Sequence, residues 1–464
     1  MKRSGSTPGA RATRVGFVSL GCAKNLVDTE VMLGHLASAG CDFVQEPRDA
    51  DVLVVNTCGF IEQAREESIR AILEASEHKK NGSVRRVVVA GCMVQRYLGE
   101  LRDSLPEVDA FIGLDELDRV VERVVPGTSA APLLTIRGPA VDRRPIPSRY
   151  LYDDRTARRL ATPPWTAYVK IAEGCDHTCA FCAIPSFRGA FRSRTTGSIV
   201  AEARALARGG VREVNLIAQD SSHFGRDRGG QESLAGLLAA LDGVDDLRWI
   251  RLHYLYPNTV TERLIDAMAR LPRVVKYVDL PLQHAHPETL RRMRRGGSAE
   301  SHLRLLDRFA GAMPDAAKRT TFIVGFPGET EDEFEALLEF VEAARFDHVG
   351  VFAYSHERET AAAKVDDDVP AALKDERLAR LMELQQRISF ERSRRFVGRK
   401  VEAVVEGAHP ETPHLLVGRT STQAMDVDGQ VLINDGVASP GSFVNLEITE
   451  VAGYDLVGRI VGAA

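Results

Sequence analysis

The stretch EGCDHTCAFCAIP, residues 173–185, places Cys175, Cys179 and Cys182 within eight residues of one another. Three thiolates on one short segment can converge on a single metal centre. Iron–sulfur cubanes are held by cysteine thiolates, normally four, so three ligands leave one iron open for a substrate or cofactor, as in catalytic metal sites. Structural zinc is an alternative, but it requires a fourth ligand, which His177 offers only with awkward geometry inside the same loop. Plain structural thiols are the other alternative.

This spacing, with the aromatic Phe181 before the last cysteine, resembles the hallmark of the radical S-adenosylmethionine (SAM) superfamily. The resemblance implies a 4Fe–4S cluster whose open iron binds SAM. It also implies that one electron cleaves SAM to methionine and a 5′-deoxyadenosyl radical. Such chemistry belongs to the cofactor, while the protein supplies orientation and seclusion. We therefore expect no catalytic residues beyond the cluster ligands.

The length of 464 residues indicates several domains. The composition is that of an ordinary globular protein, and no apolar run approaches the roughly 18 residues of a membrane span. Residues 1–13 are short, basic and rich in Ser, Gly and Pro, and we interpret them as a disordered tail. Seven cysteines without an export signal argue for a reducing compartment, so we expect a cytoplasmic protein with no membrane association. No exposed heptad run demands an oligomer, and we expect a monomer.

Residues 14–126 alternate short β-like runs with helical patterns, which is typical of a three-layer parallel α/β domain. The expected strands are residues 14–20, 51–56, 86–90 and 110–113, and the expected helices are residues 25–39, 61–78 and 115–124. Cys22, Cys58 and Cys92 each stand just past the carboxyl end of a strand. These ends share one edge of a parallel sheet, where open sheets bind ligands. We therefore expect the three thiols to be neighbours and to hold a second cluster; buried core cysteines are the alternative.

Three segments around these cysteines resemble the methylthiotransferase family of radical SAM enzymes. They are SLGCAKNLVD (residues 19–28), VNTCGF (residues 55–60) and GCMVQR (residues 91–96). Lys24-Asn25 and Val27-Asp28 are similar to the RimO branch, which modifies a ribosomal protein, rather than to the tRNA-modifying MiaB branch. Ala23 and Thr29 depart from that branch, where proline and serine are usual. The resemblance implies an auxiliary 4Fe–4S cluster on Cys22, Cys58 and Cys92, whose open iron carries the sulfur to be transferred.

Residues 127–164 are rich in proline and lack periodicity, so we expect a linker. We expect its arginine pairs at residues 143–144 and 158–159 to be solvated; contact with a partner is the alternative. From residue 165 to 396 six β/α units predict an open TIM-like (β/α)6 barrel. Its expected strands are residues 167–172, 213–218, 248–253, 276–280, 320–324 and 348–354. Its expected helices are residues 198–208, 232–241, 259–270, 299–311 and 331–345, followed by a long helix at residues 370–396.

The carboxyl ends of the barrel strands carry the candidates for SAM binding. The resemblance implies that Gln219 contacts the methionine moiety and that backbone around Gly325 lies against the adenine. Arg192 and Arg194 could pair with the SAM carboxylate, since arginine suits carboxylates; a structural role is the alternative. Thr330 and Glu333 have the spacing of a helix capping box.

Residues 397–464 change to a period of two, which predicts a small antiparallel β-barrel. Its expected strands are residues 400–406, 414–419, 424–427, 431–433, 443–449 and 455–461. The segment is similar to the TRAM domain that ends methylthiotransferases. From residue 396 onward, four basic residues stand against nine acidic ones, a net charge of −5. Such a surface would repel RNA, where phosphate neutralisation dominates binding, and attract a basic protein; a solubility role is the alternative.

The resemblance to RimO-type methylthiotransferases implies that a methylthio group is added to the β-carbon of an aspartate in small-subunit ribosomal protein S-twelve. It implies two 4Fe–4S clusters, SAM, and an electron donor such as flavodoxin or ferredoxin. The alternatives are a MiaB-type tRNA adenosine methylthiotransferase, a radical SAM enzyme whose N-terminal cysteines are structural, and a ribosome- or RNA-binding module without catalysis.

Overall fold

The computed structural model describes residues 11–125 and 146–464, and these divide into two compact units. Unit 1 comprises residues up to Ala161 together with Ala183–Ala190, and unit 2 comprises Thr162–Cys182 and Phe191–Ala464. Half of the predicted linker, including the arginines at residues 143–144, lies outside the described residues. Unit 1 therefore includes a short segment that follows the cysteine loop of unit 2 in the sequence.

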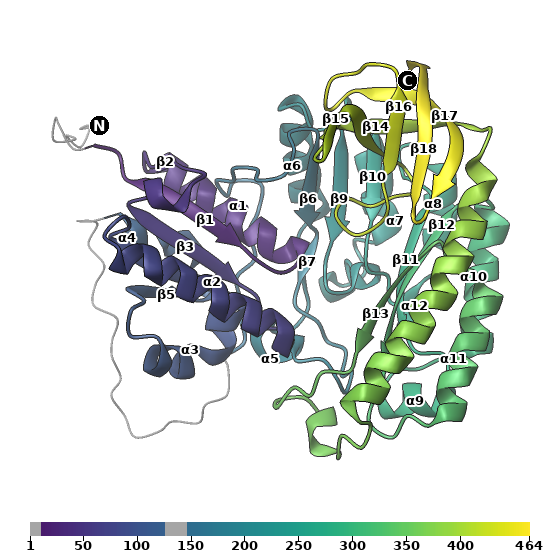
Figure 1. Cartoon of the computed structure of the whole chain (residues 1–464), viewed down its shortest axis with the longest axis horizontal. Helices are drawn as coiled ribbons and strands as arrows, with labels where there is room; N and C mark the ends of the chain where they lie inside the picture. The colour runs from purple at the N-terminus through teal and green to yellow at the C-terminus, as the bar shows by residue number, and fades with distance from the viewer. Residues whose placement is uncertain (1–10, 126–145) are drawn as a thin grey trace. The chain divides into compact units, whose positions relative to one another are not determined.

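Unit 1 is a parallel five-stranded sheet covered by helices on both faces, as the sequence predicts (Figure 1). The strand order is β2-β1-β3-β4-β5, and every pair is parallel. Its strands are β1 (Arg14–Ser19), β2 (Asp42–Phe43), β3 (Val52–Thr57), β4 (Arg86–Gly91) and β5 (Ala110–Ile112). The central strand β3 is buried along its whole length, because its mostly apolar residues face helices on both sides.

Four α-helices of unit 1 cover the two faces of this sheet. They are α1 (Ala23–Ser38), α2 (Glu62–Lys80), α3 (Cys92–Ser104) and α4 (Val120–Val124). Met32 and Leu36 of α1 pack with α4 on one face, while Ile72 of α2 packs with Met93 and Val94 of α3 on the other. The sequence analysis missed α3, which begins at Cys92 itself. Short β2, which follows the buried Cys41, was also not predicted.

One linker prediction is wrong within the described residues. Arg158 is not solvated: its side chain is 7% exposed and forms an ion pair with the buried Glu30 of α1, with Nη2 and Oε2 2.5 Å apart. Arg159 is exposed, as expected, and its guanidinium lies over the ring of Phe43, 4.6 Å from its centroid. This proline-rich segment therefore packs on unit 1, which local sequence patterns could not reveal because both partners are remote in sequence.

Unit 2 contains the six predicted β/α units. The strands of these six units form two parallel three-stranded sheets. The first has the order β10-β9-β6, from β6 (Thr166–Lys170), β9 (Glu213–Ile217) and β10 (Trp249–Leu252). The second has the order β11-β12-β13, from β11 (Tyr277–Gln283), β12 (Ala317–Val324) and β13 (His348–Ala353). A parallel bridge between Ile250 and Val274 joins the two sheets, so the six strands follow one another as an open barrel.

Six helices of unit 2 follow the strands as expected from the sequence. They are α6 (Thr196–Arg208), α7 (Leu234–Asp242), α8 (Glu262–Arg270), α10 (Ala299–Ala312), α11 (Glu331–Ala344) and α12 (Ala371–Ser393). The short helix α9 (Pro287–Arg292) was not predicted. The predicted capping box of α11 is confirmed: the Glu333 amide donates to Thr330 Oγ1, and the Thr330 amide donates to Glu333 Oε2. A short antiparallel pair, β7 (Ala172–Glu173) and β8 (Arg192–Ser193), flanks the cysteine loop in the sequence.

The C-terminal segment closes into a five-stranded barrel of order β14-β15-β16-β18-β17. Its strands are β14 (Lys400–His409), β15 (Thr412–Thr420), β16 (Val431–Asp435), β17 (Phe443–Ala452) and β18 (Asp455–Ala463). Two predictions need correction. Residues 424–427 form a turn instead of a strand, in which the Ala424 amide donates to Asp428 Oδ2. The barrel is antiparallel except for the parallel pair β16–β18.

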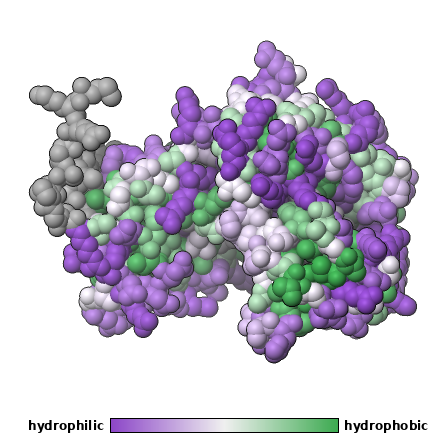
Figure 2. All heavy atoms as spheres, turned by 90° about the horizontal axis from the view of Figure 1, so that it is seen from above, coloured by the Kyte–Doolittle hydropathy of each residue, from purple (hydrophilic) through white to green (hydrophobic). Residues whose placement is uncertain are grey.

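Among the described residues, no helix combines the length and the apolar character needed to cross a bilayer. Hydrophilic side chains, in purple, cover much of the face drawn in Figure 2.

Candidate functional site: two cysteine trios

Cys22, Cys58 and Cys92 lie at the carboxyl ends of β1, β3 and β4. Cys22 is the N-cap residue of α1, Cys58 follows β3 directly, and Cys92 opens α3. Cys22 and Cys58 are close enough to Cys92 for their thiolate charges to raise its pKa. The three thiols therefore share one place at the sheet edge, while Cys41 is buried in the core on α1 and α4.

A glycine stands beside each of these cysteines, and each packs closely against a neighbouring chain segment. A Cβ added at Gly21 would lie 2.8 Å from Cβ and 3.1 Å from Sγ of Cys58. One added at Gly59 would lie 2.7 Å from Cα of Met93, next to Cys92, and one at Gly91 would lie 2.6 Å from the Thr57 carbonyl. Only glycine allows the backbone to approach this closely. The Gly-Cys and Cys-Gly dipeptides are the sequence signal for this packing.

Asn25, in the segment that resembles the RimO branch, and Thr29, which follows that segment, form hydrogen bonds around this site. Asn25 donates from Nδ2 to the Leu20 and Thr57 carbonyls, and its Oδ1 lies 3.8 Å from Cys92 Sγ. Thr29 Oγ1 pairs with Ser19 Oγ at 2.8 Å and accepts from Asn56 Nδ2 at 2.8 Å. The departure from serine at Thr29 therefore retains the hydroxyl that the buried network uses.

Arg188 was missed by the sequence analysis. It ends α5 (Ile184–Arg188), is 2% exposed, and places Nη2 2.9 Å from Cys92 Sγ and 3.0 Å from Asp28 Oδ2. Nothing in the local sequence marks it, because its partners lie 96 and 160 residues away.

At two cysteines of this first trio, Cys58 and Cys92, the surroundings disfavour the deprotonated thiolate form. Desolvation raises the pKa of Cys92 to about 12, against the opposing charge of Arg188. Desolvation also raises the pKa of Cys58. At Cys22 desolvation is outweighed by the charges of Lys24 and Arg188, so its pKa is lowered. Metals bind the thiolate form and displace protons, so this donor set fits an iron–sulfur cluster with three protein ligands.

Cys175, Cys179 and Cys182 lie on the irregular loop between β7 and α5. The loop is fixed by the Ala180 amide, which donates to the Met293 carbonyl at 2.8 Å, and by the Cys182 amide, which donates to the Cys179 carbonyl. Desolvation raises the pKa of Cys175 to about 12, and the nearby Cys179 adds to the shift. These three sulfurs likewise fit a cluster with one iron that lacks a protein ligand.

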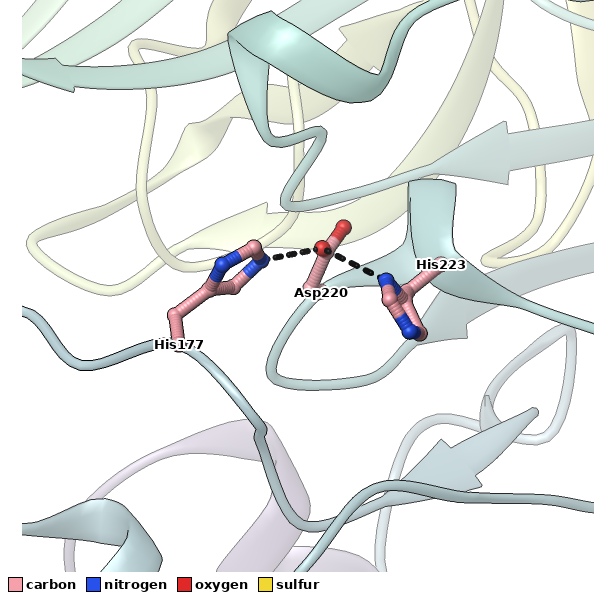
Figure 3. A group of neighbouring side chains, drawn as sticks. All are labelled: His177, Asp220 and His223. Carbon is pink, nitrogen blue, oxygen red and sulfur yellow. Dashed lines mark hydrogen bonds and ion pairs between the residues drawn. The ribbon is translucent and has the colours of Figure 1, made fainter. Parts of the chain in front are cut away.

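His177, in the middle of this loop, is anchored to the barrel (Figure 3). Its Nε2 lies 2.7 Å from Oδ2 of the buried Asp220, which follows β9, and its ring stacks on Tyr256 with centroids 3.8 Å apart. His223 Nδ1 lies 4.0 Å from the same carboxylate oxygen. Because Nε2 of His177 already pairs with Asp220, the structure gives this ring an anchoring contact.

Arg295 reaches the same loop. Its Nη1 donates to Cys179 Sγ at 3.5 Å, and its guanidinium lies 4.4 Å from the centroid of the Tyr256 ring. One aromatic ring thus contacts both His177 and the arginine that meets a ligand sulfur.

The two SAM candidates of the sequence analysis lie at strand ends of unit 2. Gln219 follows β9, and its Nε2 donates at 2.5 Å to Oε1 of Glu173, the last residue before the cysteine loop; Oε2 of Glu173 pairs with buried Lys170. Gly325 follows β12 with φ +69°, and its amide donates to Glu329 Oε1. Arg194 has a structural contact, a buried ion pair with Glu202.

Three family models match this chain. Residues 14–113 match "Uncharacterized protein family UPF0004", residues 169–341 match the radical SAM superfamily, and residues 397–461 match the TRAM domain.

Two relatives with the name "Ribosomal protein uS12 methylthiotransferase RimO" match over nearly their whole length. The protein of Anaeromyxobacter sp. (strain K) is 50% identical over 97% of this chain and 94% of its own. That of Geobacter sulfurreducens is 46% identical over 97% of this chain and 98% of its own. Among solved structures, the radical SAM methyltransferase TsrM of Kitasatospora setae aligns with a TM-score of 0.55 at 16% identity. That alignment covers 76% of this chain and 77% of TsrM, and shows a shared fold.

Proposed function

Because this chain belongs to the RimO-type radical SAM methylthiotransferases, we propose that its substrate is ribosomal protein uS12 and its product a methylthio group on the β-carbon of one aspartate. The observation that supports the proposal is that Cys22, Cys58 and Cys92, far apart in the sequence, lie near one another, beside relatives of this name at 46–50% identity. An unactivated C–H bond has no acidic proton, so an ordinary side-chain base cannot remove it.

We assign Cys175, Cys179 and Cys182 to the cluster at which SAM is cleaved. When bound, a 4Fe–4S cluster with an open iron supplies the electron for that cleavage. The protein's part is to hold the loop still: Asp220 and Tyr256 fix His177, and Met293 fixes Ala180.

We assign Cys22, Cys58 and Cys92 to the auxiliary cluster, which brings the number of 4Fe–4S clusters to two. The close packing of Gly21 on Cys58 and the contact of Arg188 with Cys92 support this assignment.

We propose that Gln219 and Gly325 contribute to the binding of SAM. The Oε1 atom of Gln219 is buried and has no hydrogen-bond partner among the described residues, while its Nε2 is held by Glu173. This oxygen therefore suits a donor such as the SAM ammonium. Gly325 has a left-handed φ of +69°, and a Cβ there would run into the Lys374 side chain, so only glycine fits this turn.

The charge of the C-terminal barrel supports a basic protein as the substrate. Its net charge is −5 from residue 396 onward, and one of its four basic residues, Arg419, is buried between Glu213 and Glu406. The side chain of Asp428 is buried as well, so three basic and eight acidic residues remain, and the balance stays at −5. An acidic surface steers a basic partner and repels RNA. We further propose that the protein is a cytoplasmic monomer that receives electrons from a flavodoxin or ferredoxin.

Mass spectrometry tests the substrate. With the gene present, the uS12 peptide that contains the target aspartate should gain the mass of a methylthio group, and deletion should abolish it. Methylthiolated tRNA adenosines that disappear with the gene, with uS12 unchanged, would instead establish a MiaB-type activity.

Iron quantitation after anaerobic reconstitution tests the cofactors. Two cubanes require about eight irons per chain and one requires about four. The Cys58→Ala variant should still release 5′-deoxyadenosine but form no methylthio product. Sulfur transfer by this variant would mean that the first trio is structural.

A further inference from the structure

Arg188 is a buried arginine of unit 1 whose place neither the proposed catalytic roles nor the sequence motifs account for. It lies at the end of α5, in the segment Ala183–Ala190 that joins unit 1. The side chain is 2% exposed, and Nη2 lies between Cys92 Sγ at 2.9 Å and Asp28 Oδ2 at 3.0 Å. One guanidinium nitrogen thus meets a candidate cluster ligand and a carboxylate together.

Asp28 fixes the direction of this guanidinium. Its side chain is 3% exposed and stands on α1, six residues after Cys22, so one helix carries both a ligand and the carboxylate that orients the arginine. A buried ion pair contributes little net stability, because desolvation offsets the attraction. Net stability therefore does not explain the pair of Arg188 and Asp28. What distinguishes it from a purely structural ion pair is that it holds a positive charge next to the sulfur of Cys92, a candidate cluster ligand.

Arg188 acts on the trio through Cys92. Its Nη2 donates to Cys92 Sγ, and Cys92 stands at the same sheet edge as Cys22 and Cys58. Reduction potentials of iron–sulfur clusters depend on net charge, on hydrogen bonds to the sulfurs and on solvent exposure. A cation that donates to a ligand sulfur stabilises the more negative, reduced form and so raises the potential.

We propose that Arg188, oriented by Asp28, is a positioning residue that sets the reduction potential of the cluster held by Cys22, Cys58 and Cys92. The proposal rests on the proposed function, since it requires that this trio binds a cluster. The proposal gives Asp28, which lies in the segment that resembles the RimO branch, a role at the auxiliary cluster.

The test uses the full chain with Cys175, Cys179 and Cys182 all replaced by alanine, so that only the first trio can bind iron. In this background Arg188→Gln removes the charge, Arg188→Lys keeps it, and Asp28→Asn removes the orienting carboxylate. Arg158→Gln is the matched control, because Arg158 is also buried in unit 1 and paired with Glu30 but is not placed at a cysteine. Each variant is reconstituted anaerobically, its iron and sulfide are counted, and its potential is measured by redox titration followed by electron paramagnetic resonance.

We expect Arg188→Gln to lower the ratio of reduced to oxidised cluster about tenfold at a fixed potential, equivalent to about 59 mV for one electron. Arg188→Lys should restore most of the shift, Asp28→Asn should give part of it, and Arg158→Gln should give none. If Arg188→Gln loses iron instead, Arg188→Lys should recover four irons per chain. An unchanged potential in an iron-loaded Arg188→Gln variant, or failure of lysine to recover iron, would overturn the role of Arg188 alone. Absence of iron from the parent background would overturn the assignment of the trio itself.

Discussion

Nε2 of His177 lies 2.7 Å from Oδ2 of Asp220, and this contact ties the middle of the cysteine loop to the end of β9. The carboxylate is buried, with its side chain 2% exposed, while the histidine is 23% exposed. The loop itself has no regular secondary structure between β7 and α5. Its shape therefore depends on side-chain contacts of this kind.

His177→Phe should weaken iron retention, because phenylalanine keeps the stack on Tyr256 but loses the bond to Asp220. Loss of a partner that orients a metal-binding segment typically costs about 10–100-fold in metal affinity or activity. Iron loss during a chelator challenge and the initial rate of 5′-deoxyadenosine release would measure this effect. His223→Phe is the control, since its nitrogen is 4.0 Å from the same carboxylate, and equal losses in both variants would count against an anchoring role for His177.

Gly21→Ala should impair the first trio. At φ +85° an alanine is strained by about 1–2 kcal/mol, and its Cβ would lie 2.8 Å from Cβ of Cys58. Gly40→Ala is the matched control, because Gly40 has φ +80° but its added Cβ would have no atom of residues 11–125 or 146–464 within 4 Å. We expect iron bound by the first trio to fall only in Gly21→Ala. Parallel losses in the two variants would mean that backbone strain alone is responsible.

Thr29→Val should destabilise unit 1 by about 1–3 kcal/mol, because it leaves the buried amide of Asn56 and the hydroxyl of Ser19 without their shared partner. Thr29→Ser keeps the oxygen and should change the free energy of unfolding little. Urea unfolding of the two variants would distinguish them. A serine variant as unstable as the valine variant would show that the methyl group, and not the hydroxyl, matters.

The buried ion pairs of Glu213 should make the stability of unit 2 depend on acid pH. Despite desolvation, Arg419 and Arg251 lower the pKa of Glu213 from 4.5 to about 2. A carboxyl whose folded pKa is depressed contributes stability above its unfolded pKa, here about 3 kcal/mol. That contribution should fall as the pH drops from 4.5 towards 2. Glu213→Gln should flatten the change of melting midpoint over this range, and an unchanged slope would contradict the assignment.

A substitution of Arg419, in the C-terminal barrel, provides a second test of the buried ion pairs of Glu213. Arg419 contacts Glu213 of β9 at 2.7 Å and Glu406 of β14 at 2.7 Å. Removal of one partner of a buried pair costs about 3–5 kcal/mol, so Arg419→Met should lower the unfolding midpoint strongly. Arg459→Met removes a mostly exposed pair with Glu447 in the same barrel, and we expect no measurable change from it.

The order and type of the elements could be read from the sequence where hydrophobic periodicity is strong. The six strands of the open barrel and the strands of the N-terminal sheet follow this rule, as do the helices between them. The turn at residues 424–427 was mistaken for a strand because Ala424 and Met425 are buried against neighbouring structure, not in a β ladder. Helix α3 was missed because it opens directly at Cys92 with Gly91 as its N-cap, so the Ser, Thr, Asp or Asn residue that usually marks a helix start is missing.

By itself the sequence determined the six candidate cysteines, the family and the three-part order of the chain, because each depends on residue types at fixed spacings. Only the tertiary structure decided what surrounds the sulfurs. Arg188 and Asp28 are 160 residues apart, and no local pattern can predict that one guanidinium nitrogen will join that carboxylate to Cys92 Sγ. Folding brings them together because a parallel sheet gathers its strand ends at one edge, and a segment far along the chain returns to cover it.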